Sequence, residues 1–245
     1  GDNMSFLEQN KEFAKAKPFV TAVIVAAGNS TRMGGVNKQF LLIDGVPVLI
    51  RTLLAFSQSD MIDEIIVAAR EEDIPKMFAM IKEYKVLKVT DIVKGGKTRQ
   101  ESVFNAIRRS SPLSEYFAIH DGARPLVTEE IIENTVREAF LTGAAATGVR
   151  VKDTVKVVNE SGFITATPDR NYLWAVHTPQ VFERRLYLSA IDNVLNSEMF
   201  TDDCKLLEEY GAEVKMVEGS YENIKITTPE DTDIAQAILY RREQL

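Results

Sequence analysis

The chain has 245 residues, of which 45% are hydrophobic and 27% charged, a composition that suits one globular domain, alone or with an appendage. Its formal net charge of −7 argues against a general nucleic-acid binder, because binding to a phosphate backbone needs a basic surface. No apolar run approaches the roughly 20 residues that a membrane-spanning helix needs. We therefore expect neither a nucleic acid nor a membrane among its partners.

Few residues of this chain can build a disulfide or a metal centre. Cys204 is the only cysteine, which excludes an internal disulfide and a multi-cysteine metal site and is consistent with the cytoplasm. His120 and His177 are the only histidines, too few for a histidine-rich zinc centre. Residues 1–17 are polar and lack the apolar region of a secretory signal, so we interpret them as a leader or an expression remnant. Residues 18–245 are expected to form a single domain.

The first predicted strand is the apolar, β-branched run at residues 22–25, typical of a strand buried on both faces of a parallel sheet. The small residues of Ala26-Ala27-Gly28 follow it and would let backbone N–H groups approach an anion. Arg32 and Lys38 add the positive charge needed to hold a triphosphate. The alternative is a tight turn with solvated cations, and the loop matches neither the Walker pattern nor Gly-x-Gly-x-x-Gly.

Strands and helices then alternate up to residue 149, which indicates an α/β fold with a doubly wound, mostly parallel sheet. In such folds ligands bind at the carboxyl ends of the strands, where the glycine-rich segments of this chain fall. Thr128 is the predicted N-cap of one helix, and the two glutamates after it suit the positive end of the helix dipole. We expect strands at 63–69, 86–93, 116–120 and 144–149, and helices at 46–59, 74–84, 98–110 and 128–141.

The alternation breaks at residues 151–170, which we expect to form a protruding β-hairpin. Residues 154–158 and 163–165 would be its strands, joined by a turn at 159–162. Its flanks are too polar for core strands. Because its valines and Phe163 are apolar, the hairpin would be stable only if something covers these side chains. We expect a second subunit to cover them, so that the hairpin is a β-arm for dimerisation. Packing on its own domain is the alternative.

The remainder of the chain returns to helices and strands. The sequence predicts helices at 182–195 and 203–210, a strand at 214–217 and a final helix from Pro229, which suits a first turn. Cys204 lies in a helical pattern beside leucines, so a packing role is expected for it rather than a reactive thiol.

A second glycine-rich segment joins a strand end to a helix start. Gly95 and Gly96 precede a predicted helix whose first turns carry Arg99 and Ser102 on one face. A helix N-terminus of this kind favours an anion or the polar edge of a base. The alternative is a plain turn with a solvated arginine.

Asp121 ends a buried strand and is followed closely by a glycine and Arg124. A carboxylate in that place suits Mg²⁺, which takes oxygen ligands and few protein carboxylates when it bridges phosphates. Its alternative role is to cap the following turn. The neighbouring His120 is expected to be a packed strand residue rather than a catalyst.

Three more polar residues have two possible roles each. Arg170 could clamp a phosphate and Thr178 could donate a hydrogen bond to one, or both could be surface residues with local bonds. Lys225 interrupts the apolar segment 224–226 and either extends to the surface or reaches into a site.

These motifs resemble a known family. The first loop is similar to the Gly-x-Gly-[Ser/Thr]-Arg-Met loop of Rossmann-like nucleotidyltransferases, with Ser30 at the second glycine. From about Val20 to the final helix, the chain resembles the 2-C-methyl-D-erythritol 4-phosphate cytidylyltransferases of the non-mevalonate isoprenoid pathway. The motifs that carry this resemblance are Ala-Ala-Gly-x-x-x-Arg-Met with Lys38-Gln39, Gly-Gly-x-x-Arg-x-x-Ser, His-Asp-Gly-Ala-Arg-Pro, Lys-Asp-Thr at 152–154, Asp-Arg-Asn with Trp174, Thr-Pro-Gln, Thr201-Asp202-Asp203 and Asn-Ile-Lys.

The resemblance implies a Rossmann-like fold of the nucleotide-diphospho-sugar transferase type and a cytoplasmic homodimer. It implies transfer of CMP from CTP to methylerythritol 4-phosphate, with Mg²⁺ bound mainly through the CTP phosphates and also at Asp121. Arg32, Lys38 and Lys225 would be catalytic. The sugar phosphate would be bound, partly across the dimer, by Asp121, Arg124, Thr154, Arg170 and Thr178. CTP would be bound by Ala26, Ala27, Gly28, Arg32, Lys38, Gly95, Gly96, Arg99, Ser102, Asp121 and Lys225.

The resemblance leaves two alternatives open. A ribitol 5-phosphate cytidylyltransferase would share most of these motifs. A catalytically inactive nucleotide-binding module would keep the fold without turnover.

Overall fold

The computed structural model describes residues 16–28, 35, 37–194 and 200–244. Nearly all of the predicted leader at 1–17 lies outside these ranges, as do Ser30 and Arg32 of the first loop. Within the described ranges, no helix is long and apolar enough to cross a membrane.

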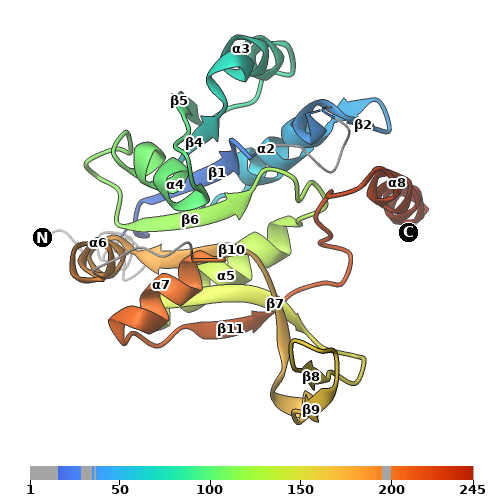
Figure 1. Ribbon diagram of the computed structural model, residues 1–245. Coiled ribbons are helices and arrows are strands. Elements are labelled where there is room, and N and C mark those ends of the chain that lie inside the picture. The colour runs from blue at the N-terminus through green and yellow to red at the C-terminus, as the bar shows by residue number, and fades with distance from the viewer. Residues whose placement is uncertain (1–15, 29–34, 36, 195–199, 245) are drawn as a thin grey trace, which may run out of the picture.

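Seven strands of the described chain form one central sheet (Figure 1). Their order is β11-β7-β10-β6-β1-β4-β5, and neighbouring strands are parallel except where β10 is one of the pair. This confirms the predicted Rossmann-like, mostly parallel α/β sheet. The strands are β1 (Val20–Ala26), β4 (Glu64–Ala69), β5 (Val89–Lys94), β6 (Tyr116–Asp121), β7 (Ala144–Arg150), β10 (Trp174–Glu183) and β11 (Lys215–Glu218).

β1 lies inside the sheet because its sequence has no polar face to turn to water. Val23 pairs with Ile66 of β4 on one side and with Ile119 of β6 on the other, and all three side chains are fully buried. The register also brings the ends of these strands together, because Val25 pairs with Asp121 and the next residue of β1 pairs with the last of β4. The loops that follow the three strands therefore meet at one edge of the sheet.

Helices cover both faces of the sheet and give the molecule three layers (Figure 1). α2, α3 and α5 pack on one face around Phe56 and Ile132, whereas α4, α6 and α7 pack on the other around Phe117 and Tyr187. α8 covers a smaller apolar cluster that includes Ile226. The helices are α2 (Val48–Gln58), α3 (Ile74–Glu83), α4 (Arg99–Ile107), α5 (Glu129–Thr142), α6 (Arg184–Asn193), α7 (Asp203–Tyr210) and α8 (Pro229–Glu243).

Short elements complete the fold, and the predicted helix starts are confirmed at two positions. The Thr128 hydroxyl accepts a hydrogen bond from the Ile131 N–H at the start of α5, and Pro229 occupies the first turn of α8. The short elements are β2 (Leu42–Ile43), β3 (Val46–Pro47), η2 (Lys38–Phe40), η3 (Glu71–Asp73) and η4 (Arg170–Tyr172).

β10 is the strand that the sequence analysis missed. It runs antiparallel between β6 and β7, and the predicted helical start at Phe182 is wrong because Phe182 and Glu183 belong to this strand. Pro179 is unexpected in a central strand, because proline has no backbone N–H to donate to the neighbouring strand. The pairing with β7 shifts register between Val176 and Gln180, and this irregularity accommodates the proline.

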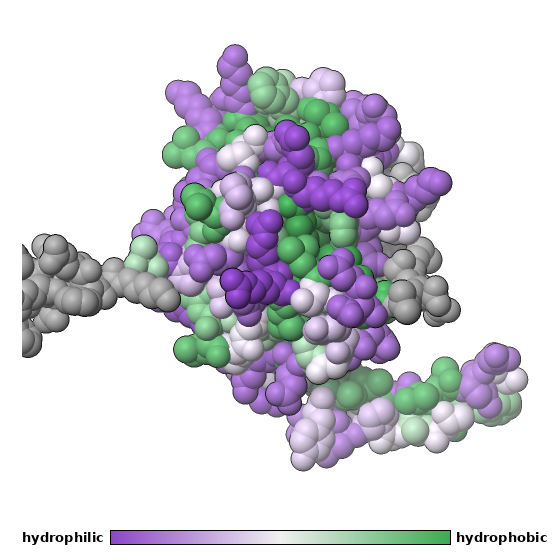
Figure 2. All heavy atoms as spheres, turned by 90° about the vertical axis from the view of Figure 1, so that its left-hand side faces the viewer, coloured by the Kyte–Doolittle hydropathy of each residue, from purple (hydrophilic) through white to green (hydrophobic). Residues whose placement is uncertain are grey.

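The predicted hairpin is present and forms an arm that projects from the domain beside β7 (Figure 1). Its first strand, β8 (Val157–Val158), is shorter than predicted, and its second, β9 (Ile164–Ala166), has the predicted length but begins one residue later. Four of its apolar side chains are largely exposed, namely Val157, Val158, Phe163 and Ile164. Figure 2 shows hydrophobic residues along this projecting arm. Cover of these four side chains by a second subunit stays a prediction.

Candidate active site

A pocket of about 450 Å³ lies at the carboxyl ends of β1, β4, β5 and β6. Its position is the one that a doubly wound sheet favours for a ligand. Cations outnumber anions on its walls, which suits a polyanionic ligand. The charged residues that line it are Lys38, Arg70, Lys94, Lys97, Arg99 and Lys225, against Glu71, Glu72 and Asp121.

Gly95 lets the segment after β5 approach the end of β1 closely. Its N–H donates to the Ala69 carbonyl at 2.8 Å, which holds this backbone against β4. A Cβ added to Gly95 would lie 2.4 Å from the Ala27 Cβ and 2.8 Å from the Ser102 Oγ. Only glycine therefore fits at position 95. The segments Ala27-Gly28 and Gly95-Gly96 together form one wall of the pocket.

Ser102 fixes the backbone of the adjacent glycine turn. Its hydroxyl accepts a hydrogen bond from the Gly96 N–H and donates one to the Thr98 carbonyl, each at 3.0 Å. Thr98 in turn caps α4 by accepting from the Glu101 N–H. Ser102 is 2% exposed, so its hydroxyl shapes the glycine turn beneath the pocket.

Lys38 is presented to the pocket by a short capped turn. Asn37 precedes it and is the N-cap of η2, where its side-chain oxygen accepts from the Gln39 N–H at 3.0 Å. The amide group of Asn37 donates to Asp73 at 2.7 Å, which ties this turn to the start of α3. Lys38 therefore enters the pocket from a segment that the buried Asn37 side chain anchors.

The Asp121 carboxylate is the centre of the ion pairs in the site. In the described chain, three cations surround its carboxylate: Lys225 Nζ lies 3.1 Å from Oδ2, Arg99 Nη2 lies 3.4 Å from Oδ1, and Arg124 Nε lies 3.7 Å from Oδ2. Burial alone would raise the pKa of Asp121, but Arg99, Lys225 and Arg124 outweigh it and hold the pKa below its ordinary value. The carboxylate is therefore ionised at neutral pH.

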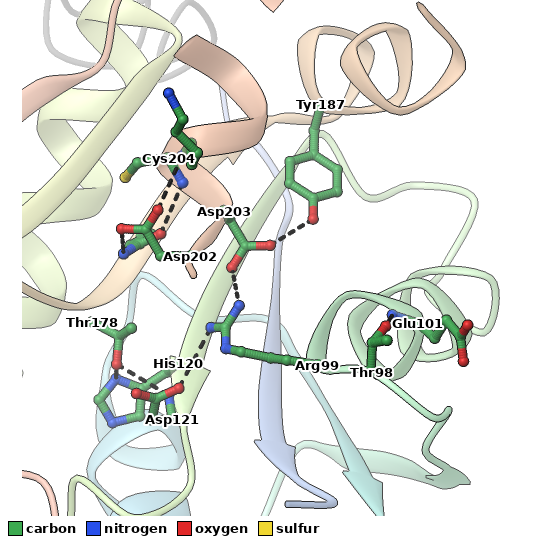
Figure 3. Close-up of polar contacts among 12 residues, drawn as sticks. Thr98, Arg99, Glu101, His120, Asp121, Thr178, Tyr187, Asp202, Asp203 and Cys204 are labelled. Carbon is green, nitrogen blue, oxygen red and sulfur yellow. Dashed lines mark hydrogen bonds and ion pairs between the residues drawn. The ribbon is translucent and has the colours of Figure 1, made fainter. Parts of the chain in front are cut away.

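His120 and Thr178 lie beside Asp121 and fix the end of β6 (Figure 3). The Thr178 hydroxyl accepts from the Asp121 N–H at 3.0 Å and lies 2.9 Å from His120 Nδ1, while His120 Nε2 lies 3.1 Å from the Arg124 carbonyl. A carbonyl can only accept, so Nε2 carries the proton and Nδ1 accepts from Thr178. His120 is fully buried, as expected for a packed strand residue.

The pocket brings together most of the residues that the sequence singled out. Ala26 lies at the buried end of β1, and Arg124 contacts Asp121 while its Nη1 donates to the Asn223 carbonyl at 2.6 Å. Lys225 reaches into the site instead of pointing to the surface. The predicted residues that line the pocket are Ala27, Gly28, Lys38, Gly95, Gly96, Arg99, Ser102, Asp121 and Lys225.

Four predicted substrate residues are not among the described residues that line the pocket: Arg124, Thr154, Arg170 and Thr178. Thr178 is buried, with its hydroxyl bonded as above. Thr154 is exposed within the arm, and Arg170 lies at the base of the arm with Nη1 donating to the Lys152 carbonyl at 2.6 Å. Their roles toward the sugar phosphate stay predictions. Arg32 lies outside the described residues.

Sequence reasoning missed the wall that follows β4. Ala69, Arg70, Glu71 and Glu72 line the pocket there, yet no glycine marks them. The rule that ligands bind at strand carboxyl ends applied to this strand too, and would have identified them. Asp203, which contacts Arg99 at 2.6 Å, was named in a motif without a role.

Asp121 can serve as a protein ligand to a divalent cation. No cluster of three His, Cys, Asp or Glu side chains suited to a metal occurs in the described part of the chain. A carboxylate has about four lone-pair positions, so Asp121 can keep its cationic neighbours and still accept another partner. Mg²⁺ in phosphate-transfer sites usually takes one or two carboxylates plus phosphate oxygens, and this donor set fits that pattern.

The arrangement defines a class of protein. A Rossmann-like sheet whose strand ends enclose a cation-lined, glycine-bordered pocket fits a nucleotide-binding protein. The family model described as 2-C-methyl-D-erythritol 4-phosphate cytidylyltransferase (IspD) matches residues 20–241. The chain belongs to this family.

Individual relatives agree with this assignment. The chain is 49% identical over 229 residues to the 2-C-methyl-D-erythritol 4-phosphate cytidylyltransferase of Caldanaerobacter subterraneus subsp. tengcongensis, covering 90% of this chain and 98% of that protein. It is 46% identical over 221 residues to the protein of the same name from Clostridium botulinum (strain ATCC 19397 / Type A), covering 89% and 96%.

Solved structures show the same fold. The crystal structure of 4-diphosphocytidyl-2C-methyl-D-erythritol synthase from Anaerococcus prevotii DSM 20548 matches with a TM-score of 0.81 at 35% identity, covering 91% of this chain and 96% of that one. The 2-C-methyl-D-erythritol 4-phosphate cytidylyltransferase of Thermus thermophilus matches with a TM-score of 0.73 at 29% identity, covering 90% and 98%. The predicted resemblance is confirmed, and neither alternative gains support.

Lowering the pH is expected to destabilise this fold through His120. Burial lowers the pKa of His120 to about 3, whereas an unfolded chain binds the same proton below about pH 6.5. The unfolded state then holds more protons, so the free energy of unfolding contributed by this group should fall by about 1.4 kcal/mol per pH unit below pH 6.5. Urea titrations at several pH values between these two pKa values measure the slope.

The control is His120→Gln, which keeps a hydrogen-bonding side chain and does not titrate in this range. It should show a clearly smaller slope than the unmodified protein. Equal slopes in the two proteins would contradict this account of His120.

Proposed function

We propose that this protein transfers the cytidylyl group of CTP to 2-C-methyl-D-erythritol 4-phosphate and releases pyrophosphate. The observation that carries the proposal is the cation-lined pocket around Asp121, in a chain that belongs to this cytidylyltransferase family. The pocket supplies what a triphosphate needs, namely small-residue backbone beside several cations.

CTP is bound along the wall formed by the ends of β1 and β5. The backbone at Ala26, Ala27 and Gly28 faces the phosphates together with Lys38, and Arg32 joins them from the same loop. The turn at Gly95 and Gly96, with Arg99 and Ser102, lies beside the base. Members of both groups line one pocket, which supports their binding one ligand: Ala27, Gly28, Lys38, Gly95, Gly96, Arg99 and Ser102.

The reaction is an in-line displacement at the α-phosphorus. A phosphate oxygen of methylerythritol 4-phosphate attacks, a new P–O bond forms, and the bond to pyrophosphate breaks. The nucleophile needs no protein base, because the second pKa of a phosphomonoester is about 6 and the group is largely ionised at neutral pH. Lys38, Arg32 and Lys225 stabilise the negative charge that gathers around phosphorus.

In our proposal Asp121 would be the protein ligand of a divalent cation, Mg²⁺, held mainly by the CTP phosphates. When bound, the cation would neutralise charge on the phosphoryl oxygens. The protein contributes the orientation of Asp121, whose backbone N–H is fixed by the Thr178 hydroxyl at 3.0 Å.

The sugar-phosphate site is shared between two subunits in this proposal. The exposed apolar side chains of the arm, such as Phe163 and Ile164, support a homodimer in which residues 151–170 cover each other or a neighbouring domain. Thr154 and Arg170 would then reach the partner's pocket, where Asp121, Arg124 and Thr178 complete the site. Residues 18–245 act as one domain.

We also propose that the enzyme works in the cytoplasm. Cys204 is the single cysteine, and it is buried in an apolar cluster with its pKa raised mainly by burial. The fold therefore needs no oxidising compartment.

Pyrophosphate release tests the proposed reaction directly. The assay combines the protein with CTP, Mg²⁺ and either methylerythritol 4-phosphate or ribitol 5-phosphate, and repeats each with UTP and ATP. We expect turnover with CTP and methylerythritol phosphate. Preference for ribitol phosphate would move the protein to another pathway, and CTP binding without release would make it a binding module.

Lys38→Ala is expected to slow turnover strongly. Loss of one preorganised group that stabilises transition-state charge costs about 3 kcal/mol, so kcat should fall by a factor of about 100 or more. Steady-state kinetics on the folded variant, verified by circular dichroism, measure this. Turnover close to that of the unmodified protein would exclude the role.

Arg170→Ala is expected to raise the KM for methylerythritol phosphate far more than the KM for CTP, because Arg170 lies on the arm and away from the CTP wall. Equal effects on the two KM values would refute the assignment.

A subunit-exchange experiment tests whether Arg170 acts across the dimer. If it does, mixing the Arg170→Ala and Lys38→Ala proteins should restore activity. Each mixed dimer then has one pocket in which both Lys38 and Arg170 are present. No restoration from exchanged subunits would contradict the shared site.

A further inference from the structure

Asp203 has no role in the chemistry described above. It begins α7, its side chain is only 2% exposed, and it is not among the described residues that line the pocket. A buried carboxylate is costly unless cations and hydrogen-bond donors compensate it. The groups that compensate it therefore indicate what Asp203 does.

Two side chains from different helices hold the Asp203 carboxylate in the described structure (Figure 3). The Tyr187 hydroxyl of α6 donates to Oδ1 at 2.7 Å, and Arg99 Nη1 of α4 donates to Oδ2 at 2.6 Å. The second terminal nitrogen of Arg99, Nη2, lies 3.4 Å from Asp121 Oδ1. The guanidinium thus bridges two carboxylates, and its shorter contact is with Asp203.

The pKa shifts of Arg99 and Tyr187 agree with this geometry. Burial works against the charge of Arg99, but Asp203 and Asp121 outweigh it and raise the pKa of the guanidinium above its ordinary value. Burial also raises the pKa of Tyr187, so its hydroxyl remains a donor. The Asp203 carboxylate thus clamps one side of the Arg99 guanidinium.

The clamp matters because a guanidinium and a carboxylate readily form a bidentate pair. Without Asp203, both terminal nitrogens of Arg99 would be free to close on Asp121. That movement would occupy the Asp121 carboxylate and draw Arg99 away from the pocket wall that it lines.

We propose that Asp203, oriented by Tyr187, is a positioning residue that keeps Arg99 extended along the nucleotide pocket. This inference rests on the proposed function, because it takes Arg99 as a CTP-binding residue. The second aspartate of the Thr201-Asp202-Asp203 motif thereby has a function in the site, although its side chain touches no substrate.

The neighbouring residue provides a matched control. Asp202 carries the same charge one position earlier, but its oxygens accept from the Lys205 N–H at 3.0 Å and the Gln180 side chain at 3.3 Å, not from Arg99. Asn is as good an N-cap as Asp, so Asp202→Asn removes the charge and keeps the helix start.

The test is CTP binding by isothermal titration calorimetry, with steady-state kinetics alongside. Asp203→Asn should weaken CTP binding about tenfold or more, the effect of losing one hydrogen bond to a charged group. The KM for CTP should rise more than the KM for methylerythritol phosphate. Asp202→Asn should stay within about twofold of the unmodified protein, and Tyr187→Phe should fall between the two.

A double-mutant cycle separates positioning from a general structural effect. Arg99→Gln with Asp203→Asn should bind CTP as weakly as Arg99→Gln alone, because Asp203 acts only through Arg99. The double variant removes both charges of the buried pair, so it remains informative if Asp203→Asn alone does not fold.

Two results would overturn the inference. One is unchanged CTP affinity in folded Asp203→Asn, and the other is a further loss of affinity when Asp203→Asn is added to Arg99→Gln. Failure of the unmodified protein to bind CTP or to release pyrophosphate would instead refute the proposed function, so the two failures are distinguishable.

Discussion

The structure of the site depends on the ion pairs of one buried carboxylate, that of Asp121. Arg99, Arg124 and Lys225 come from three different segments of the chain, and each lies within 3.7 Å of a carboxylate oxygen. A buried carboxylate is costly unless it is paired, so Asp121 depends on its cations. The pairing brings the start of α4, the loop after β6 and the segment before α8 to the same point.

The strand order explains why the carboxylate stands there. β6 lies next to β1 in the sheet, so Asp121 emerges beside the small residues that end β1. The backbone N–H of Asp121 is held by Thr178 of β10, the antiparallel strand on the other side of β6. The fold thus supplies a polar floor, a closely packed glycine wall and a set of cations before any nucleotide arrives. Preorganisation of this kind is what electrostatic stabilisation of a transition state requires.

Much of the fold could be predicted from the sequence because local patterns and tertiary structure agree. The apolar run of β1 and the capping threonine of α5 are examples in which one signal was enough. β10 could not be predicted in the same way, since the proline within it contradicts a central strand and only the register shift with β7 resolves the conflict. Strand order also depends on long-range pairing that no local pattern contains.

In the candidate site too, local patterns predict some residues, whereas others are identified only by the fold. Residues marked by glycines or by the ends of strands, such as Gly95 and Asp121, were found because the chemistry of a turn is local. Asp203 was not assigned a role, because its partners Arg99 and Tyr187 are distant in sequence and only the fold brings them together. The role of the arm residue Arg170 rests on resemblance, and its action from a partner subunit stays a proposal.

The most direct test of this account is the free energy of unfolding of Asp121→Asn, measured by urea titration without ligands. Asparagine keeps the shape of the side chain and removes its charge. Because Arg99, Arg124 and Lys225 would lose their shared counter-ion, we predict a loss of about 3 kcal/mol. A variant as stable as the unmodified protein, or more stable, would show that Asp121 serves the reaction alone and does not hold the site together.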